Sequence, residues 1–341
     1  MGALVAPGFL ETLVGPVREI TEAPLISVGF SGSKHARLRV AAGDGTEASF
    51  VLKRIVPAED WTCSWNGRTD SREANLLGSE VLDDVWEIFH CPYLGYGVEE
   101  GEVGLLMEDL TPFLFPDARV PLEEAAETQL IGALADLHAR FWNDESAALP
   151  WLSTPADYLD LLGPERVLGV WESGRPPGQL AGAIVSGWEE VLRRVPAPVA
   201  EIMRSPGSDL VRFWRGLPHT VVHGDAKVAN FARLPNGRLA AFDWAMMGWA
   251  PPSVDLGWYL AVNATRLARP KDELLALYRR ILEDRIAYEF AQPVWERLER
   301  HAVLMGARAL LWSKANALVA GREGAEAEWS WWVDRLVALA D

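Results

Sequence analysis

Cysteine is nearly absent from this chain of 341 residues. Cys63 and Cys91 are too few for a disulfide framework, and they do not have the spacing of metal ligands. No apolar run reaches the length of a membrane-spanning helix. The first segment, Met1 to Glu11, has no basic stretch and contains Pro7, which is not typical of a secretory signal. We therefore expect a cytoplasmic protein with no membrane partner.

Positive charge is also scarce. The formal net charge is −16 at pH 7, and nucleic acids and acidic membranes bind to basic faces, so we expect neither as a partner. The acidic balance is compatible with a cationic small molecule, but an ordinary solvated surface is the explanation that we favour. Five of the 32 basic residues are lysine, and three of these five, Lys34, Lys53 and Lys227, lie in the segments discussed below. A lysine is a compact point charge that suits a phosphate group.

Hydrophobic residues are plentiful and follow two different patterns along the chain. They make up 49% of the sequence, which is ordinary for a globular protein of one large or two moderate domains. The first hundred or so residues have the pattern of short strands separated by turns, and the remainder has long helical patterns. We expect strands at 24–28, 36–40, 48–53, 93–98 and 103–107, and helices at 70–85, 123–142, 179–194, 254–263, 272–290, 294–318 and 325–340. This layout predicts an α+β protein with two lobes.

The most informative stretch is VVHGDAKVAN at residues 221–230, followed by AFDW at residues 241–244. The pattern predicts a buried strand, a loop with an acid and an amide, a hairpin and then a second acid. Phosphoryl transfer needs one carboxylate for the acceptor's proton, an amide and a second carboxylate for Mg²⁺, and a cation for the phosphates. These group types are present as Asp225, Asn230, Asp243 and Lys227.

A hairpin is expected between Asn230 and Asp243. The segment contains Asn236-Gly237, a signal for a two-residue hairpin turn, with apolar residues beyond it. Such a hairpin would bring Asn230 and Asp243 toward one another and within reach of one metal cluster. The alternative is a surface loop whose acids never meet.

The spacing of these residues resembles the protein-kinase catalytic loop H-R-D-x-x-x-x-N, which precedes the metal-binding Asp of D-F-G. Here His223-Gly224-Asp225 is followed by Asn230 at the fifth position after the Asp. Because Gly224 replaces the Arg, the region resembles the aminoglycoside phosphotransferase and choline kinase-like superfamily. The resemblance implies a bilobal protein-kinase-like fold. Its N-lobe, 1–108, would hold an antiparallel sheet and one helix, and its C-lobe, 109–341, would be mostly helical, with a hinge at about 107–112.

The same resemblance implies roles for the loop residues. Asp225 would act as the base or orient the acceptor hydroxyl, and Asn230 and Asp243 would bind Mg²⁺. Lys227 would neutralise the γ-phosphate, although aminoglycoside and choline kinases commonly carry another residue at its position.

Two more residues would support the loop. Asp255, in the sequence SVDLGW, resembles the superfamily Asp that starts a helix and braces the catalytic loop through its backbone. A simple helix-terminal carboxylate is the alternative for Asp255. His223 is expected to have a structural role, with hydrogen bonds inside the loop. His138, in the sequence LHARFW, is expected to be a satisfied core or interface histidine.

Lys53 ends an expected strand, as does the kinase lysine that contacts the α- and β-phosphates of ATP and pairs with a Glu on the next helix. Glu73, 20 residues downstream, is the best partner for Lys53, and Glu80 is the second choice. The alternative is that Lys53 only keeps an edge strand soluble and that Glu73 is a solvated charge.

Two other segments resemble nucleotide-binding parts of kinases. The glycine-rich sequence GFSGSK would bring backbone N–H groups close to phosphates through Gly29, Ser31, Gly32 and Ser33. It lacks the full G-x-G-x-x-G pattern, and a plain β-turn explains it about as well. Backbone groups near Met107 to Asp109 would bind the adenine edge.

The implied activity is the Mg²⁺-dependent transfer of the γ-phosphate of ATP to a hydroxyl group of a small molecule. A protein acceptor is disfavoured because 11 residues separate Asp243 from Asp255, which leaves no room for an activation segment, and no A-P-E motif follows. A choline kinase would usually carry a Glu soon after the metal-binding Asp, whereas this chain has Trp244-Ala245-Met246-Met247. An amino sugar, an aminoglycoside or a similar natural product is the expected acceptor. The alternative is a pseudokinase-like module that binds nucleotide or a metabolite without turnover.

Tryptophan is unusually frequent, with 16 residues, and Trp244, Trp249 and Trp258 lie near the expected metal loop. An aromatic cage for a cation is one interpretation. Core packing of a helical lobe is the one we favour, since large aromatic side chains usually supply buried area.

Overall fold

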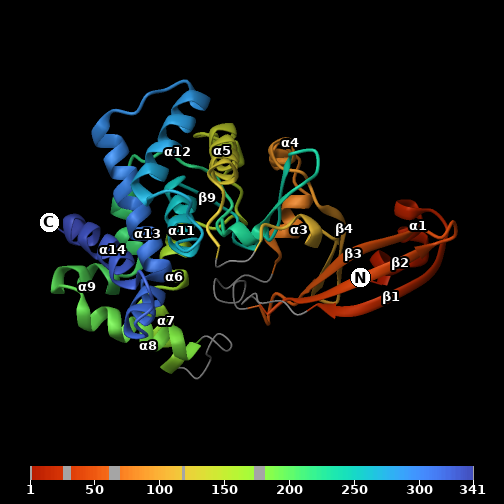
Figure 1. The fold of residues 1–341 in the computed structure, drawn as a ribbon, viewed down its shortest axis with the longest axis horizontal. Coiled ribbons are helices and arrows are strands. Elements are labelled where there is room, and N and C mark those ends of the chain that lie inside the picture. Colours follow the sequence, from red (N-terminus) through yellow and green to blue (C-terminus); the bar gives the residue numbers. More distant parts are fainter. Residues whose placement is uncertain (1, 26–31, 61–69, 117–119, 173–180, 341) are drawn as a thin grey trace. The chain divides into compact units, whose positions relative to one another are not determined.

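The computed structural model describes residues 2–25, 32–60, 70–116, 120–172 and 181–340 (Figure 1). The chain divides into two compact units. The first, which we call the strand unit, comprises Met1–Phe115 and Phe231–Ala245. The second, the helical unit, comprises Pro116–Asn230 and Met246–Asp341. The contacts therefore assign 231–245 to the strand unit, and the division at 108 with a hinge at 107–112 stays a prediction.

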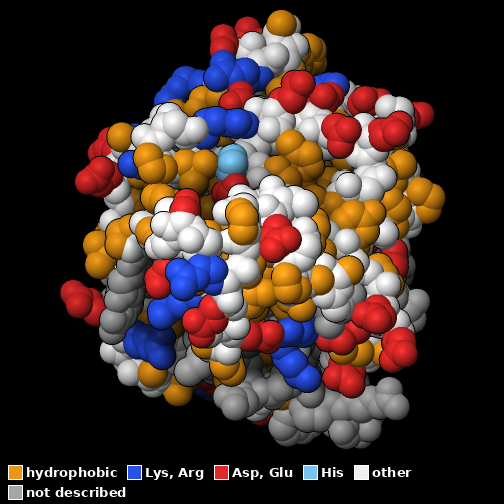
Figure 2. Space-filling view, turned by 90° about the vertical axis from the view of Figure 1, so that its right-hand side faces the viewer, with side chains coloured by type: hydrophobic (Ala, Val, Ile, Leu, Met, Phe, Trp, Pro, Cys, Tyr) orange, Lys and Arg blue, Asp and Glu red, His pale blue; other side chains and the backbone are white. Residues whose placement is uncertain are grey.

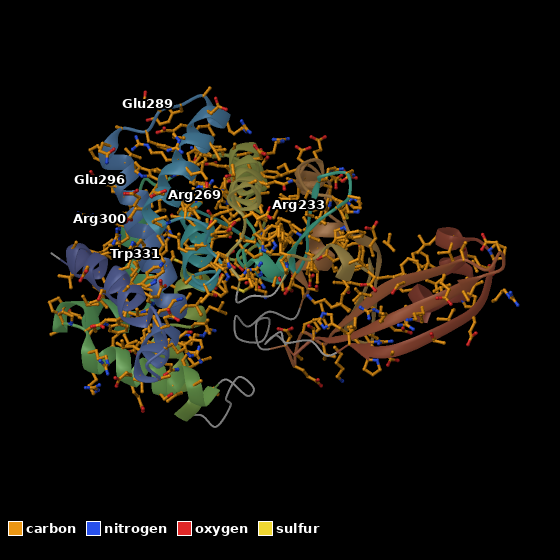
Figure 3. The ribbon with its side chains drawn as sticks, in the orientation of Figure 1. Arg233, Arg269, Glu289, Glu296, Arg300 and Trp331 are labelled. Atoms are coloured by element: carbon orange, nitrogen blue, oxygen red, sulfur yellow. The ribbon has the colours of Figure 1, made fainter. Side chains whose placement is uncertain are left out.

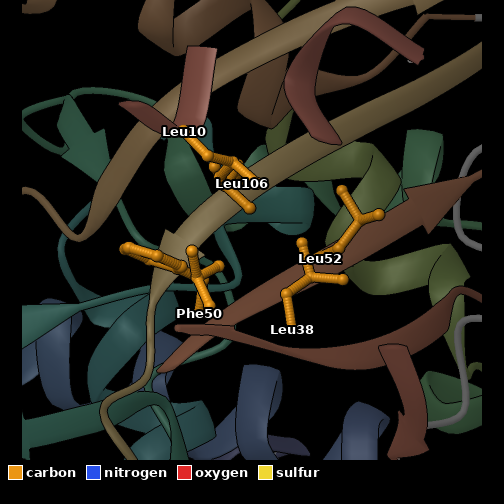
Figure 4. Close-up of a cluster of buried hydrophobic side chains, with 6 residues drawn as sticks. Leu10, Leu38, Phe50, Leu52 and Leu106 are labelled. Carbon is orange, nitrogen blue, oxygen red and sulfur yellow. The ribbon is translucent and has the colours of Figure 1, made fainter. Parts of the chain in front are cut away.

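A five-stranded antiparallel sheet forms the strand unit, in the order β1-β2-β3-β5-β4. Its strands are β1 (Val17–Leu25), β2 (Lys34–Ala42), β3 (Glu47–Ile55), β4 (Tyr93–Glu99) and β5 (Glu102–Glu108). Side chains alternate between the two faces of a strand. One face therefore gathers a cluster of buried apolar residues, Leu38, Val40, Phe50, Leu52 and Leu106, to which helix α1 (Pro7–Val14) adds Leu10 (Figure 4).

Two expectations for this unit were wrong in their bounds. The first strand begins at Val17, not at 24, while 26–28 lie outside the described residues, and its side chains are mostly exposed because it lies at the sheet edge. An edge strand of this kind lacks the apolar alternation by which strands are recognised. The predicted helix 70–85 is interrupted, because α3 (Arg72–Leu77) ends at Gly78 and α4 (Val85–Ile88) follows separately. Helix α1 (Pro7–Val14), with Pro7 in its first turn, was not predicted.

A hairpin follows Asn230, formed by β7 (Phe231–Arg233) and β8 (Leu239–Ala241). Its turn is longer than predicted. The N–H of Leu234 donates to the carbonyl of Arg238 at 2.9 Å, which leaves a loop of three residues. The N–H of Gly237 donates to the carbonyl of Leu234, and Gly237 has a φ of 83°. This is a type I turn followed by a left-handed residue, a common three-residue hairpin loop.

Helices make up most of the helical unit (Figure 1). They are α5 (Glu124–Arg140), α6 (Pro155–Leu161), α7 (Pro164–Glu172), α8 (Ala181–Arg194), α9 (Ala197–Arg204), α10 (Gly207–Leu210), α11 (Ser253–Val262), α12 (Lys271–Ile286), α13 (Gln292–Val319) and α14 (Ala325–Ala340). Two short strands, β6 (Thr220–Val222) and β9 (Gly248–Ala250), pair with one another. Helix α13 packs against α8, α11 and α14 and is the centre of this unit. Among the described residues, no helix combines the length and the hydropathy needed to cross a bilayer.

A buried ion pair joins α5 to the start of α12. Glu127 of α5 has no exposed surface, and its carboxylate accepts hydrogen bonds from Arg269 at 2.9 Å and from the N–H of Ala268 at 2.9 Å. Figure 3 labels Arg269 where the chain enters α12. A buried carboxylate is tolerated only when it is paired in this way.

Charged side chains of both signs are interspersed on the face that Figure 2 shows. Lys and Arg side chains occur there in small groups, with Asp and Glu side chains between them. This mixture is ordinary for a solvated protein surface.

Glycines allow a close approach between two helices of the helical unit. A Cβ atom at Gly257 of α11 would overlap the carbonyl oxygen of Ala302 in α13. A Cβ atom at Gly306 would in turn lie against the carbonyl oxygen of Gly257. The two backbones are therefore in contact, which is possible only without side chains at these positions.

His301 lies next to this contact, on α13. It is buried, and its Nδ1 shares a 2.6 Å hydrogen bond with the hydroxyl of Ser253 at the start of α11. The ring of Trp214 lies edge-on to it, with 4.1 Å between ring centroids. Burial lowers the pKa of His301 well below its usual value, and His219 and Arg297 act in the same direction. His301 is therefore neutral at pH 7.

We predict that Gly257→Ala lowers the free energy of unfolding by about 1–3 kcal/mol, because the added methyl group overpacks the contact between α11 and α13. The matched control is Gly132→Ala on α5, where nothing lies within 4 Å of an added Cβ atom. That variant is expected to gain about 0.5–1 kcal/mol, since alanine favours a helix over glycine. Urea unfolding of both variants checks the pair, and equal effects would contradict the packing argument.

We also predict that His301 makes the protein less stable in acid. In the unfolded chain a histidine binds a proton below about pH 6.5, whereas the buried ring stays neutral, so stability falls as the pH drops below that value. The measurement is Tm at pH 7.5 and at pH 5.5, in the wild type and in His301→Gln. The variant should lose less of its Tm over this interval than the wild type, and an equal loss in the two proteins would contradict the prediction.

Candidate functional site

The candidate catalytic loop, residues 223–230, begins where the buried strand β6 ends in the helical unit. Gly224 has a φ of 81°, a conformation that favours glycine. A Cβ atom at Gly224 would also overlap the carbonyl oxygen of Met246. Glycine is thus required at this position by its backbone conformation and by its neighbour.

Asp255, in the first turn of α11, holds this loop by its backbone. One carboxylate oxygen accepts the N–H of Gly224 at 2.7 Å, and the other accepts the N–H of His223 at 2.8 Å. The predicted brace is therefore present. His138 of α5 adds a contact of 3.1 Å to the same carboxylate through Nε2, and its Nδ1 lies 2.7 Å from the hydroxyl of Tyr278.

His223 and His138 have the structural positions expected of them. The Nδ1 atom of His223 accepts the N–H of Asp225 at 3.3 Å, inside the loop. His138 is fully buried. Both rings therefore support the loop from within the helical unit.

Asn263 holds the other end of the loop and was not predicted. It follows the last residue of α11, and its amide oxygen accepts the N–H of Val228 at 2.9 Å. Its amide nitrogen donates to the carbonyl of Ala226 at 3.1 Å. Helix α11 thus fixes the loop near both of its ends.

The carboxylate of Asp225 is 7% exposed and has three hydrogen-bond donors around it. Lys227 donates to Oδ2 at 2.6 Å, and the amide of Asn230 donates to the same oxygen at 3.0 Å. The indole N–H of Trp258 donates to Oδ1 at 2.8 Å. Of the three, Lys227 and Asn230 were predicted to lie in this loop, whereas Trp258 comes from α11.

A second constellation lies in the strand unit, and it is a closed ring of hydrogen bonds. Lys53 of β3 donates to Glu73 of α3 at 2.6 Å and to Asp243 at 2.8 Å. The hydroxyl of Tyr93 donates to the other oxygen of Glu73 at 2.8 Å and accepts the backbone N–H of Asp243 at 3.2 Å. The predicted pair of Lys53 and Glu73 is therefore present, and Glu80, the second choice, is not part of the ring.

Burial and charge set the protonation states in this ring. Burial opposes the charge of Lys53, but Asp243 and Glu73 outweigh it and raise the pKa of the ammonium group above its usual value. Burial, together with Glu73, raises the pKa of Tyr93 well above 10. Burial also raises the pKa of Glu73, which Lys53 opposes. Lys53 is therefore a cation, and Tyr93 keeps its proton as a donor.

Asp243 is placed by its backbone. Its φ of 63° is left-handed, a conformation that Asp tolerates better than most residues. The next residue, Trp244, is fully buried between Trp86 and Phe89, with ring centroids 6.1 and 5.8 Å away. Trp244 thus packs a core, as we favoured for the tryptophans, but this core belongs to the strand unit and not to a helical lobe. The packing anchors the segment that carries Asp243.

The other predicted nucleotide-binding residues have more ordinary surroundings. Met107 is buried in β5, where it pairs with Val51 of β3. The carboxylate of Asp109 accepts hydrogen bonds from Ser49 at 2.6 Å and from Arg37 at 2.9 Å. Gly32 and Ser33 precede β2, and Gly32 has a φ of 86°. Gly29 and Ser31 lie outside the described residues.

Asn230 and Asp243 are suited to Mg²⁺, which prefers oxygen ligands. The amide nitrogen of Asn230 makes both of its bonds to Asp225, so its amide oxygen is the atom available to a cation. The side chain of Asp243 is 30% exposed, and one of its oxygens already binds Lys53. Within the described ranges, no group of three or more His, Cys, Asp or Glu side chains is placed to hold a metal ion.

Sequence reasoning missed Tyr93 and Asn263, and it placed Trp258 near the metal loop without assigning it a partner. Trp258 lies three residues after Asp255 on a helix, and such residues share a helix face, so spacing could have identified it. Asn263 ends the same helix. Tyr93 opens an expected strand, and no sequence signal connects it with Glu73 or Asp243.

Comparisons with known proteins bear on the family and the fold of this chain. A family model described as "Phosphotransferase enzyme family" matches residues 98–299. A comparison with curated protein sequences found no match. Among solved structures, a spectinomycin phosphotransferase, APH(9)-Ia, in complex with ADP and spectinomycin is 10% identical, with a TM-score of 0.50 over 98% of this chain and 93% of that one. The choline kinase LicA from Streptococcus pneumoniae is 13% identical, with a TM-score of 0.48 over 97% of each chain. The predicted α+β, protein-kinase-like fold is confirmed.

We predict that Tyr93→Phe lowers the free energy of unfolding by about 1–3 kcal/mol, because Glu73 and the N–H of Asp243 each lose a buried partner. Tyr288→Phe is the matched control, since Tyr288 is 55% exposed and its ring contact with Phe290 does not need the hydroxyl. Urea unfolding measures both. A loss in Tyr93→Phe no larger than in the control would contradict the closed ring.

Proposed function

The chain belongs to the phosphotransferase enzyme family, and we propose that it transfers the γ-phosphoryl group of ATP to a hydroxyl group of a small molecule, with Mg²⁺. The observation that carries this proposal is the carboxylate of Asp225, which three donors orient on a loop fixed by α11. A base in phosphoryl transfer needs little more than such an orientation and a bound acceptor.

In the proposed reaction, Asp225 accepts the proton of the acceptor hydroxyl. The acceptor oxygen forms a bond to the γ-phosphorus, the bond between that phosphorus and the β,γ-bridging oxygen breaks, and ADP leaves. Lys227, whose ammonium lies 2.6 Å from Asp225, supplies a positive charge where charge on the transferred group must be stabilised. The charge of Lys227 thus serves both the base and the γ-phosphate.

The ring in the strand unit suits the nucleotide. We assign Lys53 to the α- and β-phosphates, since two carboxylates keep it charged and fixed. Glu73 holds Lys53 in place. Asn230 and Asp243 would hold Mg²⁺, which neutralises phosphate charge when it is bound. Gly29, Ser31, Gly32 and Ser33 would approach the phosphates, and Met107 and Asp109 would lie near the adenine.

A hydroxylated natural product, such as an amino sugar or an aminoglycoside, is the acceptor that we propose. The net charge of −16 suits a cationic acceptor. A spectinomycin phosphotransferase with a similar fold was solved with ADP and spectinomycin, which supports testing this class first. The short segment between Asp243 and Asp255 argues against a protein acceptor.

The test is ADP release from Mg²⁺-ATP in the presence of pooled acceptors: amino sugars, aminoglycosides, sugars, amino alcohols and nucleosides. We expect one pool to stimulate release, and Asp225→Asn to lower kcat by about 10²–10⁴-fold, the usual contribution of a general base. ATP binding, measured by calorimetry, should survive in this variant. Asp334→Asn, an exposed position on α14, should retain the wild-type rate.

Two outcomes would count against the proposal. Wild-type activity in Asp225→Asn would show that another group serves as the base. ATP binding without ADP release in any pool would instead favour the binding module without turnover.

A further inference from the structure

We propose that Trp258 is a positioning residue for the base, and that its indole N–H orients Asp225 so that Oδ1 receives the proton of the acceptor hydroxyl. The inference rests on the proposed function. It adds to that function a residue that the loop motif does not contain, Trp258, and it distinguishes between the two oxygens of the Asp225 carboxylate.

The two oxygens of the Asp225 carboxylate differ in their remaining capacity to accept hydrogen bonds. A carboxylate oxygen accepts about two hydrogen bonds. Oδ2 already accepts from Lys227 at 2.6 Å and from Asn230 at 3.0 Å, so it is saturated. Among the described residues, Oδ1 accepts from Trp258 alone, at 2.8 Å. Oδ1 is therefore the oxygen that can accept one more hydrogen bond, which is what a base needs to make with a hydroxyl group.

The donor to Oδ1, the indole N–H of Trp258, carries no charge. An indole N–H is a donor only, and it is neutral at every accessible pH. A neutral donor orients a carboxylate but stabilises the ionised form less than a second cation would, which suits a group that must take a proton. The cation in this cluster, Lys227, is placed on the other oxygen.

Helix α11 sets the position of Trp258. Asp255 and Trp258 are three residues apart on α11 and so lie on one face of that helix. Asp255 fixes the backbone of the loop, and Trp258 fixes the side chain of its acid. Between them, Gly257 sets the helix directly against the backbone of α13. The indole therefore extends from a helix that is packed into the core of the helical unit, and its position does not depend on the loop that it orients.

The contact is tested first without any assay of activity. In a ¹H–¹⁵N spectrum of the full chain, the indole resonance of Trp258 is identified as the one lost in Trp258→Phe. A hydrogen bond to a charged acceptor is stronger than one to a neutral acceptor. Asp225→Asn should therefore move this resonance upfield and leave the indole resonance of Trp332 in place. An unmoved Trp258 resonance would overturn the contact.

The role in catalysis is tested with a matched pair of variants. Trp332→Phe also removes an indole N–H to a carboxylate, that of Glu328, at the same distance of 2.8 Å, but on α14. We expect Trp258→Phe to lower kcat about tenfold relative to Trp332→Phe, the effect of one lost hydrogen bond to a charged group. The KM for ATP should stay within twofold between the two variants, since a merely destabilised loop would change it as well.

The two arms separate the inference from the proposed function. If the wild type releases ADP and Trp258→Phe has the kcat of Trp332→Phe, the positioning role is wrong while the proposed function stands. If no acceptor stimulates ADP release in the wild type, the proposed function fails and the positioning role fails with it. The resonance of Trp258 would then still report whether the indole binds Asp225.

Discussion

The candidate catalytic loop depends on the hydrogen bonds that the carboxylate of Asp255 accepts from its backbone. A buried carboxylate is costly unless donors surround it, and the N–H groups of His223 and Gly224 together with His138 provide them. The loop depends on Asp255 in turn. The two N–H groups lie just before Asp225 in the sequence, and without Asp255 they would be buried without an acceptor. The position of Asp225 is consequently fixed by the core of the unit.

The corresponding feature of the strand unit is a buried cation, Lys53. Lys53 is 4% exposed, and only its two carboxylate partners make a charge there tolerable. Glu73 is held by Tyr93 from behind, whereas Asp243 is partly exposed. The ring thus contains one fully buried carboxylate, Glu73, and one partly exposed carboxylate, Asp243.

The sequence predicted these two clusters better than it predicted the fold around them. The pair of Lys53 and Glu73 and the brace by Asp255 were expected from the resemblance to kinase motifs, in which each residue type has a fixed place. Edge strand β1 was misplaced because exposed strands lack an apolar period. Tyr93 could not have been found, since its partners are joined to it only by the sheet and by a hairpin far along the chain.

Both clusters share a design in which an unusual backbone conformation is held by side chains from elsewhere. Gly224 and Asp243 are both left-handed, and each has its N–H bound by a buried acceptor, Asp255 and the hydroxyl of Tyr93 respectively. For Gly224 the conformation costs little, but for Asp243 it costs of order 1 kcal/mol or more, so the acceptor must offset that cost. The hydroxyl of Tyr93 can do so because burial keeps it protonated and Glu73 fixes its direction. The placement of Asp243 therefore depends on the same carboxylate that holds Lys53, which couples the two groups within one unit.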